Sequence, residues 1–187
     1  MTFAFQPLTP QRWSDLEDLF GPRGACGGCW CMWWRRSSSE FRKAKGAENR
    51  KAFHRIVEKG PAPGILAYDG GVPVGWCAFA PRESYPRFEK SRTLQPLDDK
   101  PVWSVTCFFI RKGYRRQGLS AKLLEAAKKH VRKAGGRILE GYPMVPSAKA
   151  MPDTFAWTGM LGAFEKAGFD ECARPGARAI VRIALKK

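Results

Sequence analysis

Residues 102–134 constrain the fold more than any other part of this chain. Residues 102–110 are rich in β-branched and aromatic side chains on both faces, which is typical of a strand buried on both sides. From Ser120 onward, apolar residues recur at helical spacing, at Leu123, Leu124, Ala127 and Val131, while lysine and arginine fill the opposite face. The pattern predicts a buried strand that passes through a short turn into an amphipathic helix.

The turn between this strand and this helix is basic, and Gly118 lies at the expected helix start. The first N–H groups of a helix have no partner inside it, and together with the positive end of the helix dipole they bind anions. Gly118 has no Cβ, so a phosphate can approach the backbone, and Arg115 and Arg116 add positive charge. We interpret residues 115–120 as a pyrophosphate-binding loop; an ordinary basic turn is the alternative.

Two motifs in this order resemble those of a known family. Residues 115–120, Arg-Arg-Gln-Gly-Leu-Ser, resemble the acetyl-CoA signature Arg/Gln-x-x-Gly-x-Gly/Ala of the GNAT superfamily of N-acetyltransferases, with Ser120 as a small departure at the last position. Residues 163–169, Ala-Phe-Glu-Lys-Ala-Gly-Phe, resemble the end of the family's last helix. The resemblance implies one α/β domain over residues 1–187, with a mixed, mostly antiparallel sheet and flanking helices.

Within that single domain the resemblance divides the chain in two parts. Residues 64–185 form the acyl-CoA-binding core, and residues 1–60 supply a strand and two helical segments joined by a loop rich in cysteine and tryptophan. The implied co-substrate is acetyl-CoA, attacked directly by an amine in a ternary complex. The residues implied to bind it are Phe108, Phe109, Ile110, Arg115, Arg116, Gln117, Gly118, Leu119 and Ser120.

The catalytic residues are where the chain departs from the family pattern. Many members use a tyrosine of the last helix as the acid for the leaving thiolate, but Phe164 stands there, and Trp157 replaces an asparagine found about two turns earlier. We therefore predict Tyr142 as the acid and Glu140 as the base, with Glu83 as a weaker candidate. The alternatives are that these residues are structural, that water transfers the proton, or that catalysis has been lost.

Three cysteines lie close together at Cys26, Cys29 and Cys31. Zinc needs four ligands, or three and an open position, and Cys77 or His54 could complete a site. There is no second Cys-x-x-Cys, so we predict no metal. The other interpretations are thiols packed with neighbouring tryptophans, or a loop that lines a substrate pocket.

The pocket interpretation is the one we favour for this loop. In the family, the segment between the first two helices commonly borders the acceptor site. The substrate residues predicted on this basis are Trp30, Trp33 and Trp76. Large apolar rings at such a site favour an apolar or aromatic acceptor, either a small molecule or a peptide.

The net charge of the chain is compatible with a second class of function. The chain has 187 residues and a net charge of +16, which attracts acidic partners. The alternative function is therefore a basic nucleic-acid-binding protein, either non-catalytic or acylating an RNA-borne amine. The sequence shows neither a signal peptide nor a membrane-length apolar run, so we expect a cytoplasmic protein without a membrane partner. A homodimer is among the assemblies that the sequence allows.

Overall fold

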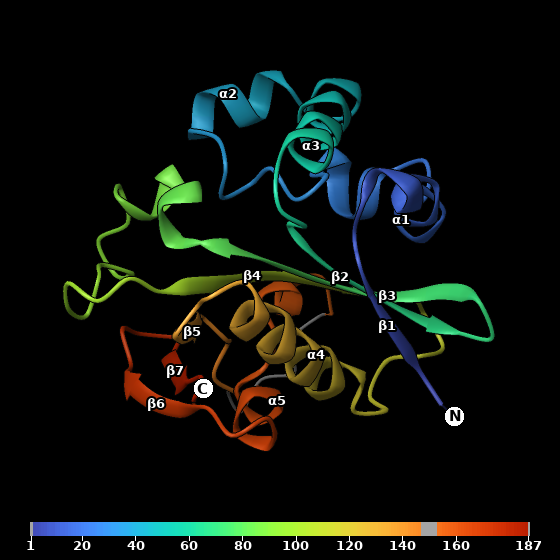
Figure 1. The fold of residues 1–187 in the computed structure, drawn as a ribbon. Helices are drawn as coiled ribbons and strands as arrows, with labels where there is room; N and C mark the ends of the chain where they lie inside the picture. Colours follow the sequence, from blue (N-terminus) through green and yellow to red (C-terminus); the bar gives the residue numbers. More distant parts are fainter. Residues whose placement is uncertain (1, 147–152, 187) are drawn as a thin grey trace.

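The computed structural model describes residues 2–146 and 153–186. Its described strands form one mixed sheet in the order β1-β2-β3-β4-β5-β7-β6, in which only β4 and β5 run parallel (Figure 1). The strands are β1 (Ala4–Pro7), β2 (Gly64–Asp69), β3 (Val72–Pro81), β4 (Trp103–Ile110), β5 (Ile138–Gly141), β6 (Asp170–Ala173) and β7 (Ile180–Ala184). The predicted single α/β domain with a mostly antiparallel sheet is confirmed.

Helices cover both faces of this sheet (Figure 1). Helices α1 (Trp13–Phe20), α2 (Ser38–Lys43) and α3 (Ala47–Lys59) lie on one face, and α4 (Leu119–Lys133) and α5 (Leu161–Lys166) lie on the other. Each face has its own apolar core: α4 buries Leu123, Leu124 and Val131 against the sheet, whereas α1 and α3 bury Leu16 and Phe53 on the opposite side. No helix of the described residues combines the length and apolar character needed to cross a bilayer.

Strand β4 contains a β-bulge and loses its strand partner on one side in its second half. Ala78 of β3 pairs with Cys107 and the next residue, Phe79, pairs with Val105, so Thr106 is an extra residue that bulges from β4. On its other side β4 pairs with β5 over three positions that end at Val105. The strand then continues to Ile110, and within the described residues no strand pairs with that side of it. Half of β4 therefore presents an open backbone edge.

Candidate active site

The predicted phosphate loop lies at the start of α4. Gly118 caps the helix in the left-handed conformation, with φ of 75°, and no side chain caps the first N–H groups. A Cβ built on Gly118 would meet no atom within 4 Å, so the backbone here faces open space. The first turn also contains no acidic residue. The helix dipole is therefore not neutralised locally, and the geometry suits a bound anion.

The side chains of this loop hold its shape. Arg115 donates from Nε to the carbonyl of Ile110 at 3.0 Å, and Gln117 donates from Nε2 to the carbonyl of Gly113 at 2.7 Å. Leu119 is 1% exposed and packs into the core below α4, which anchors the helix end to the sheet. The Arg115 contact joins the loop to the end of β4, so the anion site and the open strand edge are continuous.

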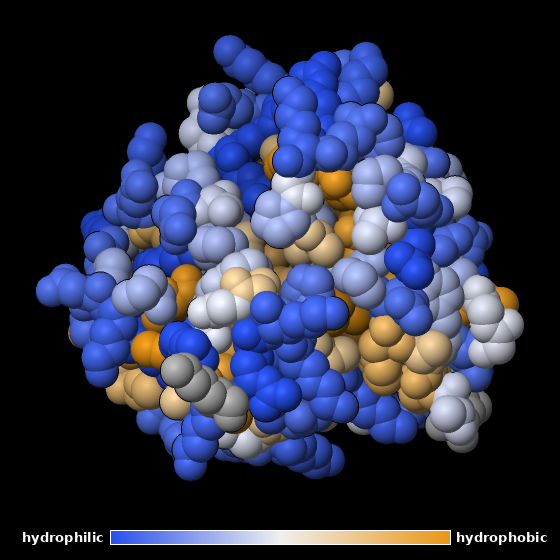
Figure 2. Space-filling model, in the orientation of Figure 1, coloured by the Kyte–Doolittle hydropathy of each residue, from blue (hydrophilic) through white to orange (hydrophobic). Residues whose placement is uncertain are grey.

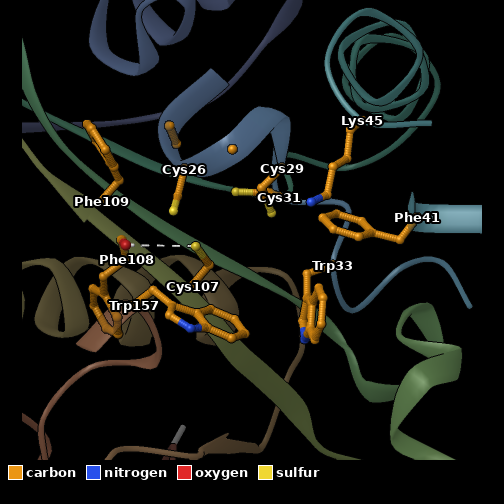
Figure 3. A pocket seen from close by; sticks show the side chains of 12 residues that line it. Cys26, Cys29, Cys31, Trp33, Phe41, Lys45, Cys107, Phe108, Phe109 and Trp157 are labelled. Carbon is orange, nitrogen blue, oxygen red and sulfur yellow. Dashed lines mark hydrogen bonds between the residues drawn. The ribbon is translucent and has the colours of Figure 1, made fainter. Parts of the chain in front are cut away.

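An apolar cavity of about 320 Å³ lies at the other end of this edge (Figure 3). Strand β4 contributes Cys107, Phe108 and Phe109 to its lining. The aromatic residues Trp33, Phe41 and Trp157 form much of the remaining wall. The indole of Trp33 meets Phe41 and Trp157 edge-on, with ring centroids 5.0 Å and 6.3 Å away. These three rings form one aromatic wall.

Left-handed backbone conformations shape the cysteine-rich loop over this cavity. Positive φ occurs at Gly24, Gly27 and Gly28, and also at Ala25, Trp30 and Cys31. Gly28 is pressed against the junction of α2 and α3, where its carbonyl accepts hydrogen bonds from the Gly46 amide at 3.0 Å and the Asn49 side chain at 3.1 Å. A Cβ at Gly28 would lie 2.5 Å from the Gly46 nitrogen. Glycine is therefore required where the loop is fixed to the helices.

Of the three predicted substrate tryptophans, the structure places only Trp33 on the cavity. Trp30 is 5% exposed and folds over Gly24 to stack on Trp13, with ring centroids 5.9 Å apart. Trp76 is fully buried on β3 and donates its indole N–H to Cys31 Sγ at 3.1 Å. Trp30 and Trp76 thus lie in the core beneath α1 and α3 and not on this cavity, so of the three only Trp33 is carried into the proposal below.

Sequence reasoning missed Phe41, Trp157 and Lys45 as cavity residues. Trp157 stands out in the sequence only as a departure from the family pattern. Phe41 follows the N-terminal capping box made by Ser37 and Glu40, which fixes the start of α2, so its place on that helix could have been anticipated. Its contact with Trp33 is a tertiary feature that local spacing does not reveal.

The predicted catalytic pair lies elsewhere, in a buried polar network. Glu140 is 1% exposed and accepts hydrogen bonds from Arg82 at 2.9 Å, Arg182 at 2.6 Å and Tyr142 at 2.5 Å. The Tyr142 hydroxyl also contacts Ser104 Oγ at 2.8 Å. Burial, with the negative charge of Glu140 next to it, raises the pKa of Tyr142 well above its usual value.

Neither member of this pair lines the cavity, and both oxygens of Glu140 are occupied by donors. The weaker candidate, Glu83, is exposed in the helical turn Arg82–Ser84 and faces a different surface hollow. Strand β5 directs Glu140 and Tyr142 into a network with Arg82 and Arg182, which favours a structural role, and proton transfer by this pair stays a prediction.

Three thiols in or near the cavity wall have raised pKa values. Burial raises the pKa of Cys29 to about 12 and the pKa of Cys77 well above the usual thiol value. A hydrogen bond with Cys31, together with burial, raises the pKa of Cys107 well above that value. In the part of the chain that the structure describes, no three histidine, cysteine, aspartate or glutamate side chains come together as a metal site. The structure therefore favours a pocket wall for this loop.

The thiols should differ sharply in reactivity toward maleimide in the native protein. Cys26 and Cys172 are exposed and should label rapidly, whereas Cys29 should not, because at about pH 8 a thiol with a pKa near 12 is thiolate in only about one molecule in 10,000. Peptide mapping by mass spectrometry after a short exposure measures this. Denatured protein, in which all six thiols should label, is the control. Rapid labelling of Cys29 in the native protein would contradict the buried environment described here.

The comparisons with known proteins agree with this geometry. The model of the "Acetyltransferase (GNAT) family" matches residues 30–151, well over half of the chain. No curated protein matches the sequence.

Solved structures share the fold at low identity. A GNAT-family acetyltransferase from Streptococcus agalactiae is 12% identical, with a TM-score of 0.58 and coverage of 99% of this chain and 96% of that one. A GNAT-family protein from Desulfovibrio desulfuricans is 17% identical, with a TM-score of 0.55 and coverage of 99% and 100%. The PaiA N-acetyltransferase from Thermoplasma acidophilum, solved in complex with coenzyme A, is 14% identical, with a TM-score of 0.54 and coverage of 98% and 99%. Together with the match of the family model, the open edge of β4 and the uncapped start of α4 identify this chain as a member of the GNAT acetyltransferase family, which uses acetyl-CoA.

Proposed function

We propose that this protein transfers the acetyl group of acetyl-CoA to the amine of an aromatic or apolar acceptor, a small molecule or a peptide, by direct attack in a ternary complex. One observation carries the proposal: the part of β4 beyond Val105, which has no strand partner on one side among the described residues, lies between the uncapped start of α4 and the aromatic cavity. A molecule with a diphosphate at one end and a reactive thioester at the other would fit along this part of β4, with the diphosphate at the start of α4 and the thioester at the cavity.

Each part of the site has a chemical task in this proposal. The N–H groups that follow Gly118 would bind the pyrophosphate, helped by Arg115 and Arg116. The backbone of Phe108, Phe109 and Ile110 would pair with the extended pantetheine arm in place of a neighbouring strand. The bulge at Thr106 lies next to Cys107 on the cavity wall, so backbone groups there are placed to polarise the thioester carbonyl.

The acceptor must attack as a neutral amine, although an alkyl amine in water has a pKa near about 10. Neither a carboxylate nor a histidine is found among the described residues that line the cavity. The apolar wall supplies a different means, because burial disfavours the charged ammonium form and lowers the pKa of a bound amine. We propose that the acceptor loses its proton to water as it enters, without a protein base. Glu140 and Tyr142 are not part of this mechanism.

An acceptor screen that follows thiol release from acetyl-CoA tests the proposal. We expect aromatic primary amines to exceed linear polyamines by at least about 10-fold in kcat/KM, because stacking on Trp33 contributes about 1 kcal/mol or more while a second ammonium finds no partner in the cavity. Trp33→Ala should remove most of this preference. Val72→Ala, which truncates an exposed apolar side chain in the β2–β3 hairpin, is the matched control and should not change it.

Preference for polyamines, or parallel initial-velocity lines that indicate an acetylated enzyme, would contradict the proposal. The nucleic-acid alternative receives less support from the structure, because α3 and α4, which carry many of the basic residues, lie on opposite faces of the sheet (Figure 1). Figure 2 shows one largely hydrophilic face with scattered apolar residues. Salt-sensitive binding of tRNA together with no thiol release would reverse this preference.

A further inference from the structure

The acceptor cavity has a one-sided distribution of charge. Lys45, which follows α2, is the single charged side chain among the described residues that line the cavity, and no carboxylate lines it. The Lys45 ammonium lies 5.8 Å from the centre of the Phe41 ring. Figure 3 shows its nitrogen directed toward Phe41 and Cys29 at the cavity wall. Within the described part of the chain, the formal charge in contact with this apolar space is therefore positive.

Lys45 has no counter-ion among the described residues, whereas two other lysines do. Lys51 pairs with Glu48 at 3.0 Å and Lys128 pairs with Glu125 at 2.7 Å. For Lys45 Nζ, the structure shows no hydrogen bond or ion pair with any described residue. An ammonium group has three donors, and a cation at the edge of an apolar cavity binds an anion more strongly than one surrounded by water.

A second positive charge, that of Arg87, lies close to the aromatic wall. The guanidinium of Arg87 stacks on the Trp33 ring at 3.9 Å from its centre, although Arg87 does not itself line the cavity. Its Nε donates to the Arg36 carbonyl at 3.1 Å, but its Nη2 is buried and bonds to no described group. Burial lowers the pKa of Arg87, and no carboxylate is among the groups that act on it. Two cations thus lie against rings of the aromatic wall, and neither has a carboxylate partner among the described residues.

Building on the acetyl transfer proposed above, we infer that the acceptor is an aromatic amine that also carries a carboxylate, and that Lys45 binds this carboxylate. The aromatic part would pack against Trp33 and Trp157, and a charge-assisted hydrogen bond to Lys45 would fix its orientation. The unpaired charge of Arg87 adds long-range attraction for the same anion. A purely cationic amine would meet only repulsion here, which is why we favour a zwitterionic acceptor.

Two product-like ligands that differ only in the carboxylate test this inference. N-acetyltryptophan and N-acetyltryptamine are titrated by calorimetry into the full-length protein in the presence of coenzyme A. We expect the acid to bind at least about 10-fold more tightly, equivalent to about 1.4 kcal/mol, and the preference to fall as salt rises from about 0.05 M to about 0.5 M. Lys45→Met should abolish the preference. Lys43→Met, an exposed lysine two residues earlier at the end of α2, is the matched control and should retain it.

Equal affinities for the two ligands, no binding of either, or a preference that survives Lys45→Met would overturn the inference. Lys45 is exposed and makes no polar contact with described residues, so its replacement should leave the fold intact, which a thermal melt checks. The binding readout does not depend on turnover. Tighter binding of the acid without thiol release for any amine would contradict the proposed acetyl transfer while supporting the carboxylate site.

Discussion

Gly118→Val is expected to weaken acetyl-CoA binding at least about 100-fold, as measured by calorimetry. Gly118 has φ of 75°, a conformation that costs a residue with a side chain about 1–2 kcal/mol and a β-branched residue more. A side chain added here would meet no protein atom within 4 Å, so it would stand in the open space that the phosphates need. The loss of binding should therefore have two causes, the conformational cost of positive φ and the steric block of the space that the phosphates need.

Gly135→Val separates the two effects. Gly135 lies just beyond the opposite end of α4, has φ of 88°, and also has open space around the position of a Cβ. It therefore carries a similar conformational cost without an uncapped helix start beside it. Both variants should lose comparable thermal stability, but only Gly118→Val should lose acetyl-CoA binding. Equal binding losses in the two variants, or none in Gly118→Val, would refute the phosphate-loop assignment.

The parts of the fold that the sequence predicts correctly are those encoded locally. The buried strand, the turn and the amphipathic pattern of α4 follow one another within about thirty residues, so hydrophobic period and turn chemistry are sufficient to identify them. The family resemblance adds Phe108, Phe109 and Ile110 as residues implied to bind acetyl-CoA, and the structure shows that β4 no longer pairs with β5 beyond Val105. Fold and cofactor edge were therefore accessible from one contiguous stretch.

The acceptor pocket was harder to predict because left-handed backbone conformations decide its lining. Trp30 itself has positive φ, as does Cys31, and Trp30 lies in the core while Trp33 lines the cavity. Neither conformation is encoded by a periodic pattern. The composition of the loop indicates an aromatic site, but it does not indicate which tryptophan faces the ligand.

The network around Glu140 could not be predicted from the sequence for a related reason. The partners that occupy its carboxylate, Arg82 and Arg182, lie 58 and 42 residues away in the sequence. A carboxylate on a central strand is a reasonable catalytic candidate when only its neighbours in sequence are considered. The tertiary pairing turns it into the centre of a buried ion network, which local reasoning cannot identify.

Glu140→Gln is therefore expected to lower stability rather than to stop chemistry. The change keeps the shape of the side chain but removes the charge that pairs with Arg82 and Arg182 at 2.9 Å and 2.6 Å. Removing one partner of a buried ion pair costs about 3–5 kcal/mol. Here Arg82 would lose its carboxylate partner, whereas Arg182 would keep Asp98 at 2.8 Å. For a protein of this size that corresponds to a fall in Tm of roughly 6–20 °C, measurable by calorimetry or circular dichroism.

Glu171→Gln gives the matched comparison for this network. Glu171 also pairs with an arginine, Arg174, at 2.6 Å, but the pair is exposed on β6 and screened by water, so its loss should change Tm little. Below its Tm, Glu140→Gln should keep a kcat per folded molecule close to that of the unmodified protein, because its side chain does not line the acceptor cavity. If kcat instead collapsed while Tm stayed unchanged, Glu140 would be a base after all, and the proton path proposed here, from the entering amine to water, would have to be replaced by one through β5.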